Sequence, residues 1–176
     1  QFLLILSACG LNDKQEDDKI KTVAYEVDRL FCMLQLQRSY NSNAFNIAVF
    51  KISAEIRNKD VSAIRPAFEK ILLELLTEAR GVQAPTSLSY GFFKETGIEL
   101  DKRFKRYFFA RIEKFIADNT KLKVKHSLYD LVQNTGSVNG FHLEHILADN
   151  DENLEIFGGD EDKFKSERNR LGGLLL

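Results

Sequence analysis

Two neighbouring residues near the C-terminal end of the chain have the types and spacing that a hydrolytic site needs. Glu144 directly precedes His145 inside a short apolar segment, Phe141–Leu147. A neutral imidazole can take a proton from an attacking water, and a carboxylate beside it can hold a divalent cation. His145 is therefore a candidate general base and Glu144 a candidate metal ligand.

This pair must be held by a rigid element if it is to do chemistry. Residues 141–147 predict a short strand, and an acidic residue before a histidine at its end is typical of the first half of a ββα-metal (HNH-like, His-Me finger) nuclease site. Side chains alternate along a strand, so Glu144 and His145 would serve one site only if the strand bends or bulges there. The alternative is a half-buried structural histidine beside an exposed glutamate.

Helices precede this strand along most of the chain. Apolar residues recur every three or four positions over 20–40, 45–57 and 99–119, and in a further helix that Asp60 or Ser62 caps and Gly81 ends. Residues 12–19 predict a polar loop, 81–98 a loop or linker, 122–124 a short strand and 127–132 a short helix. The fold class is thus mainly α, with a multi-helix domain over 1–133 and an incomplete α+β element of the ββα-metal type over 134–176.

The helix predicted at 99–119 has one apolar and one basic face. The apolar residues that fall on one broad face are Leu100, Phe104, Tyr107, Phe108, Ile112, Phe115 and Ile116. Five basic residues could form a face that contacts phosphates without reading sequence: Lys102, Arg103, Lys105, Arg106 and Arg111. The alternative is an ordinary solvated helix face. By contrast, residues 141–162 hold eight acidic side chains and no Lys or Arg.

The overall composition narrows the class of protein. A chain of 176 residues with 44% hydrophobic and 29% charged residues predicts a globular protein, and its net charge of −1 gives no general attraction to nucleic acid. Two widely spaced cysteines favour a reducing, cytoplasmic compartment, and no apolar run approaches the roughly 20 residues of a membrane span. Cys9 follows a lipoprotein-like apolar segment, but that segment is short and has no basic leader, so the end of a buried helix closed by Gly10 is favoured.

Two segments together resemble a known family. The string FHLEHIL, followed after a spacer by ERNRLGGLLL, resembles the C-terminal nuclease domain of the GmrSD-type (type IV, modification-dependent) restriction endonucleases, which typically show EHILP and then LGNLTLL. The helical region is similar to the segment that precedes that domain, through Arg29–Gln37, Tyr40–Ser42 and Lys105–Glu113. Both ends of the chain fall in apolar segments, so we expect it to be a piece of a longer protein.

The resemblance implies a bacterial, metal-dependent DNA endonuclease of phage defence, with His145 as general base and Glu144 as the carboxylate of a Mg²⁺ or Mn²⁺ site. It further implies DNA with modified bases as substrate, a nucleotide-binding domain outside this chain, and a possible homo-oligomer. Ala148 replaces the family's usual proline and Gly173 its usual asparagine, and the asparagine that completes the metal site would follow Leu176. The alternative is a non-catalytic helical interaction or DNA-binding module with a degenerate nuclease remnant.

Overall fold

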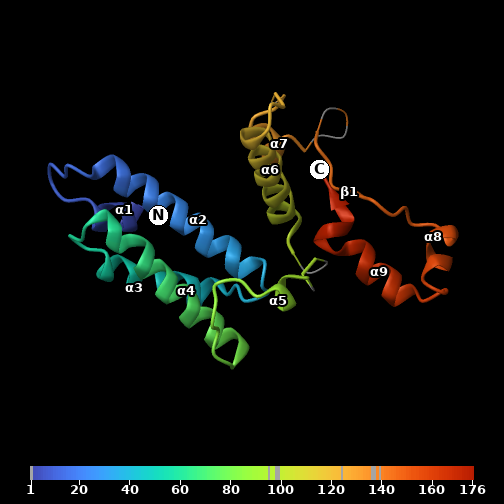
Figure 1. Cartoon of the computed structure of the whole chain (residues 1–176), viewed down its shortest axis with the longest axis horizontal. Helices are drawn as coiled ribbons and strands as arrows, with labels where there is room; N and C mark the ends of the chain where they lie inside the picture. The colour runs from blue at the N-terminus through green and yellow to red at the C-terminus, as the bar shows by residue number, and fades with distance from the viewer. Residues whose placement is uncertain (1, 95, 98–99, 124, 136–137, 139) are drawn as a thin grey trace. The chain divides into compact units, whose positions relative to one another are not determined.

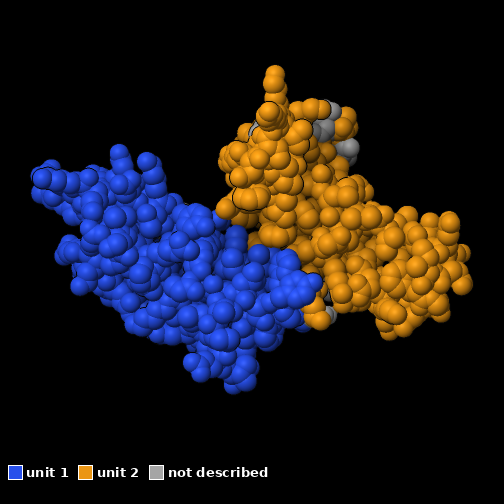
Figure 2. Space-filling view, in the orientation of Figure 1, with its two compact units in different colours: residues 1–93 blue, residues 94–176 orange. Residues whose placement is uncertain are grey.

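The chain folds into a mainly α-helical structure, as its periodicity predicts. The computed structural model describes residues 2–94, 96–97, 100–123, 125–135, 138 and 140–176. Two units, residues 1–93 and 94–176, each have their own set of internal contacts (Figure 2). We call them the first and the second unit and describe each by itself. Within the described residues, no helix is long and apolar enough to cross a membrane.

The first unit consists of helices whose ends follow from local sequence. Its elements are α1 (Phe2–Ala8), α2 (Glu16–Gln35), α3 (Ser42–Glu55), the 3₁₀ turn η1 (Val61–Ala63), α4 (Ile64–Arg80) and most of α5 (Tyr90–Lys94) (Figure 1). The Asn41 side chain accepts a hydrogen bond from the Ala44 amide and so starts α3. Gly81 ends α4 in the left-handed conformation, with φ of 67°, that glycine adopts without strain.

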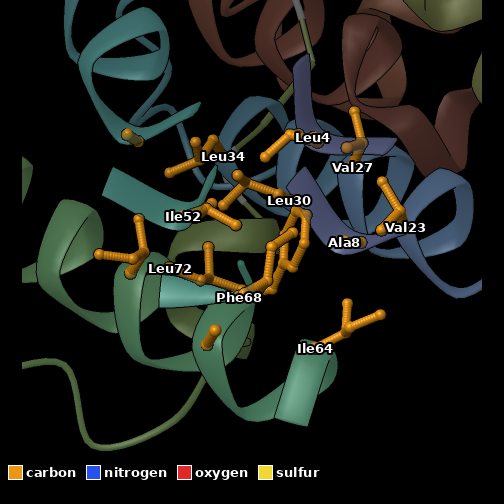
Figure 3. Close-up of a cluster of buried hydrophobic side chains, with 14 of the residues drawn as sticks. Leu4, Ala8, Val23, Val27, Leu30, Leu34, Ile52, Ile64, Phe68 and Leu72 are labelled. Atoms are coloured by element: carbon orange, nitrogen blue, oxygen red, sulfur yellow. The ribbon is translucent and has the colours of Figure 1, made fainter. Parts of the chain in front are cut away.

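The core of the first unit lies where α1, α2, α3 and α4 face one another. Leu4, Leu30, Ile52, Phe68 and Leu72 are each at most 1% exposed, and the Phe68 ring lies in the middle of the cluster (Figure 3). These residues come from four different helices. Burial of their side chains, at about 1.5–3 kcal/mol for each large apolar residue, drives the helices together.

The predicted loop at 12–19 is shorter than expected, because α2 already begins at Glu16. Three acidic residues in its first turn favour this start by interacting with the positive end of the helix dipole. Lys19 is buried in the first turns of α2, and its Nζ lies 3.1 Å from the Ala8 carbonyl oxygen and 2.7 Å from the Asp13 carboxylate. Lys19 therefore ties the end of α1 to the start of α2.

The first part of the predicted linker, residues 84–89, is held by one buried amide. Gln37 is 1% exposed, and its Nε2 donates to the carbonyl oxygens of Met33 and Ser87. Its Oε1 accepts from the Arg80 guanidinium and from the Ser89 amide, both at 2.7 Å. This side chain thus satisfies its hydrogen-bonding groups while joining the segment after α2, the end of α4 and the segment before α5.

The second unit combines helices with one small sheet. Its elements are α6 (Lys102–Asn119), α7 (Leu128–Gln133), β1 (Glu144–His145), α8 (Asp151–Ile156), α9 (Glu161–Asn169), η2 (Leu171–Gly173) and β2 (Leu174–Leu175). Asp101 caps α6 by accepting from the amides of Arg103 and Phe104, and Ser127 forms a capping box with Asp130 at the start of α7. α6 packs against α7, and α8 against α9.

Several predicted elements differ from the observed ones. The strand predicted at 141–147 is reduced to Glu144–His145, and Leu122 and Lys123 lie in no strand. α8 and α9 were not predicted, because their short, highly charged sequences lack an apolar period. The contacts divide the chain into units at 93/94, a position inside the predicted linker at 81–98.

Three of the seven apolar residues predicted to share one face over 99–119 are exposed. Leu100 and Phe104 are buried, and Tyr107 and Phe108 are half-buried, as expected for core positions. Further along the helix, the exposed fraction rises to 37% at Ile112, 67% at Phe115 and 42% at Ile116. Helical periodicity shows which residues share a face but not whether another element covers that face.

A pair of phenylalanines tests the position of the first unit's core. Phe68→Ala should lower the free energy of unfolding by about 3–5 kcal/mol, because it removes a ring from a filled cluster. The matched control is Phe50→Ala on α3, where the side chain is 65% exposed, with an expected effect of about 0.5 kcal/mol or less. Urea unfolding followed by circular dichroism measures both, and equal losses would contradict this core.

The Asp13–Lys19 pair predicts a pH dependence of stability. The hydrogen bond from Lys19, followed by those from the Gln15 and Gly10 amides, lowers the pKa of Asp13 to about 2. A carboxyl group whose pKa is lower in the folded state stabilises the fold above its unfolded pKa, and this contribution disappears as the pH falls through the folded value. We expect Asp13→Asn to lower stability at neutral pH and to reduce the loss of stability between about pH 4 and pH 2. The free energy of unfolding of both proteins, measured across this pH range, tests the prediction. Parallel pH profiles would show that the Asp13–Lys19 pair does not contribute to the pH dependence of stability.

Candidate functional site

The two segments that carry the family resemblance pair with each other in the structure. β1 and β2 form a two-stranded antiparallel sheet in which Glu144 is opposite Leu175 and His145 is opposite Leu174. The Ile146 amide donates to the Gly173 carbonyl oxygen at 2.9 Å and extends the pairing by one residue. The sheet thereby fixes the backbone that carries His145.

The sheet turns Glu144 and His145 to opposite sides. Burial alternates along 141–148, with the odd-numbered residues half-buried and the even-numbered ones exposed. Leu174, opposite His145, is 7% exposed, whereas Leu175, opposite Glu144, is 48% exposed. Regular alternation therefore continues through the pair, without the bend that would bring both side chains to one site.

An asparagine at the end of α9 holds the His145 ring. The Nε2 atom of His145 lies 3.1 Å from Oδ1 of Asn169, the last residue of α9. Asn169 in turn donates from Nδ2 to the Lys165 carbonyl oxygen, one turn earlier in the helix, at 2.7 Å. The imidazole is therefore half-buried and bonded on one nitrogen, an arrangement that fits both a general base and a structural histidine.

Two side chains hold the loop that follows His145. Arg168 donates from Nε to the Leu147 carbonyl oxygen at 2.9 Å, and Asn153 donates from Nδ2 to the Ala148 carbonyl oxygen at 2.9 Å. Asn150 caps α8 by accepting from the Asn153 amide. Arg168 and Asn153 together therefore hold the backbone directly after β1.

Gly173 stands at a close contact between the start of β2 and the end of α9. A Cβ atom at this position would lie 2.6 Å from the carbonyl oxygen of Arg168 and 3.0 Å from that of Glu167. Gly97 makes a similar approach, since its Cβ would lie 2.3 Å from the Asn169 carbonyl oxygen. Only glycine allows these backbones to approach so closely.

The charges around α9 are mostly paired along the helix itself. Lys165 donates to the Glu161 carboxylate at 2.9 Å, and this hydrogen bond lowers the pKa of Glu161 and raises that of Lys165. The guanidinium of Arg168 also lies 3.8 Å from the Asp149 carboxylate, which is exposed. These pairs offset part of the negative charge of residues 141–162.

The described residues do not form a set of metal ligands. Among them, no three His, Cys, Asp or Glu side chains come close enough to hold one ion. Glu144, the predicted metal ligand, is exposed on the opposite side of β1 from His145.

Two of the five basic residues predicted to form a nucleic-acid-binding face are exposed. Lys102 and Arg103 are exposed on the first turn of α6, and Lys105 is half-buried. Arg111 donates to the Tyr107 hydroxyl at 2.8 Å, with its guanidinium 5.7 Å from the centroid of that ring. Arg106 is only 5% exposed, so it is not part of a solvent-facing basic surface.

The remaining histidines take no part in this arrangement. His142 is exposed on the same side of the segment as Glu144. The His126 ring contacts the Phe141 ring edge-on, with centroids 4.8 Å apart. Neither residue is hydrogen-bonded to His145.

Sequence reasoning missed Asn169 and Arg168, although both stand within the ERNRLGGLLL string. An asparagine or arginine near the end of a helix is common for local reasons, such as capping and the helix dipole. Their contacts with His145 and Leu147 span 24 and 21 residues, so no local pattern could indicate them.

Comparisons with models of known protein families, with curated proteins and with solved structures give no match.

The two adjacent glycines at 172 and 173 give a matched test of the close contact. Gly173→Ala should destabilise the second unit by about 1–3 kcal/mol, because a methyl group would force β2 away from α9. Gly172→Ala, with nothing within 4 Å of its added Cβ, should change stability by about 0.5 kcal/mol or less. Amide hydrogen exchange at Ile146 reports the β1–β2 pairing directly. Equal exchange rates in the two variants would show that the contact is looser than described.

Proposed function

We propose that this chain carries the water-activating part of a DNA endonuclease, with His145 as general base. The observation that carries the proposal is the pairing of β1 with β2, which joins the two segments resembling the GmrSD-type nuclease domain and presents a half-buried, hydrogen-bonded histidine. A ββα-metal site begins with two such antiparallel strands. A base of this kind has to be held in position before substrate arrives.

The proposed reaction is phosphodiester hydrolysis. The unprotonated nitrogen of His145 takes a proton from a water molecule while the oxygen of that water attacks the phosphorus atom. A new P–O bond forms, the bond to the leaving sugar oxygen breaks, and that oxygen takes a proton from solvent. Lys102 and Arg103, exposed at the start of α6, are candidate contacts to the DNA backbone.

The remaining parts of the proposal come from the resemblance. They are Mg²⁺ or Mn²⁺ as cofactor, DNA with modified bases as substrate, a nucleotide-binding domain outside this chain and a role in phage defence. A cytoplasmic location is proposed from the two widely spaced cysteines. Glu144 faces away from His145, so its orientation does not support a role as metal ligand. That role rests on the family resemblance alone.

A second candidate is a non-catalytic helical interaction module that retains a nuclease remnant. The opposite orientation of Glu144 and His145 favours it, as does the exposed apolar face at Ile112, Phe115 and Ile116. Exposed apolar groups of this kind are common in surfaces that bind other proteins. The two candidates differ in one measurable property, the cleavage of DNA.

Two histidines three residues apart give the test. In the protein that contains this chain, His145→Ala should lower the rate of cleavage of plasmid and phage DNA by roughly 10²–10⁴-fold, the usual contribution of a general base. His142→Ala, an exposed residue on the other side of the segment, should leave the rate within about twofold, since such a surface residue contributes no proton transfer. The assay is run with Mg²⁺ or Mn²⁺, with and without nucleotide, on modified and unmodified DNA.

Circular dichroism checks that both variants fold. Equal cleavage by wild type and His145→Ala would refute the assignment of the base. No cleavage by the wild-type protein under any of these conditions would favour the interaction module.

A further inference from the structure

The two hydrogen bonds of the Asn169 amide determine which ring nitrogen of His145 carries the hydrogen. A backbone carbonyl can only accept a hydrogen bond, so the group of Asn169 that faces the Lys165 carbonyl must be its NH₂. The other end of the amide, Oδ1, then faces Nε2 of His145 at 3.1 Å. An amide oxygen can only accept, so Nε2 must carry the hydrogen when the ring is neutral.

We propose that Asn169 is a positioning residue that selects the Nε2–H tautomer of His145. In this tautomer the lone pair is on Nδ1, which makes Nδ1 the atom that can take a proton from water. Among the residues that the structure describes, no donor is bonded to Nδ1. The role of the tautomer in catalysis rests on the proposed function, but the tautomer itself does not.

The surrounding structure explains why Asn169 can hold one orientation. It is the last residue of α9, and the close contacts of Gly97 and Gly173 with 167–170 fix the backbone at this end of the helix. Its amide is bonded at both ends, to Lys165 and to His145. A flipped amide would place its NH₂ against Nε2 and its oxygen against the Lys165 carbonyl oxygen, which would lose one hydrogen bond and add a repulsion.

Two substitutions at Asn169 separate tautomer selection from a merely structural role. Asn169→Asp keeps an oxygen that accepts from Nε2–H but loses the NH₂ that bonds the helix. Asn169→Leu has a similar size and loses both groups. If Asn169 only braced α9, both variants would behave alike; if it selects the tautomer, only the leucine variant would lose the selection.

Nitrogen-15 NMR of the imidazole rings measures the tautomer directly in ¹⁵N-labelled protein in alkaline buffer. We expect the Nε2–H form of His145 to dominate in the wild type and in Asn169→Asp. In Asn169→Leu the ratio of Nε2–H to Nδ1–H should fall by roughly two- to tenfold, the factor that a typical net hydrogen bond gives. The exposed His126 and His142 are internal controls whose ratios should not change.

A dominant Nδ1–H form in the wild type, or an unchanged ratio in a folded Asn169→Leu variant, would overturn the proposal. Amide exchange across α9 in the same samples shows whether each variant is folded. If wild-type protein cleaves DNA, kcat should fall in Asn169→Leu and be largely restored in Asn169→Asp, with KM for DNA unchanged in both; equal loss in both variants would also overturn it. If wild-type protein does not cleave DNA, the proposed function fails while the NMR ratio still decides the role of Asn169.

Discussion

The arrangement around His145 depends on the close approach of two backbones at Gly173. The end of α9 and the start of β2 approach so closely that a Cβ atom at Gly173 would lie 2.6 Å from the Arg168 carbonyl oxygen. This contact places β2 directly beside the end of the helix. β2 then pairs with β1, and Asn169 at the helix end comes within hydrogen-bonding distance of the histidine that β1 carries.

The two candidate site residues differ in how firmly the structure holds them. His145 is held by the sheet, by Asn169 and by the braced loop at Leu147 and Ala148. Glu144 is exposed on the opposite side of the strand. The described residues therefore provide an oriented histidine but no converging set of metal ligands. The position of His145 thus does not depend on Glu144 or on a bound metal ion.

In the first unit, buried polar side chains hold the connections between helices. Lys19 joins the end of α1 to α2, and Gln37 joins the ends of α2 and α4 to the segment before α5. Each of these buried groups is hydrogen-bonded, which is the condition for burying a polar side chain without a large loss of stability. Apolar packing drives this unit together, and the polar contacts determine how its loops run.

The sequence by itself determined the features that depend on residues within one or two helical turns of each other. The helical character of α2, α3, α4 and α6, the cap of α3 at Asn41 and the end of α4 at Gly81 all follow from local spacing. Asp60, predicted as a cap of α4, caps the preceding turn η1 instead. It also indicated His145 as the candidate base and the alternation that separates it from Glu144. Only the tertiary structure decided that Arg106 is buried, that Ile112 and Phe115 are exposed and that Asn169 contacts His145. The physical reason is range: periodicity and capping act between neighbours, whereas burial and the His145–Asn169 contact depend on how segments 24 or more residues apart pack together.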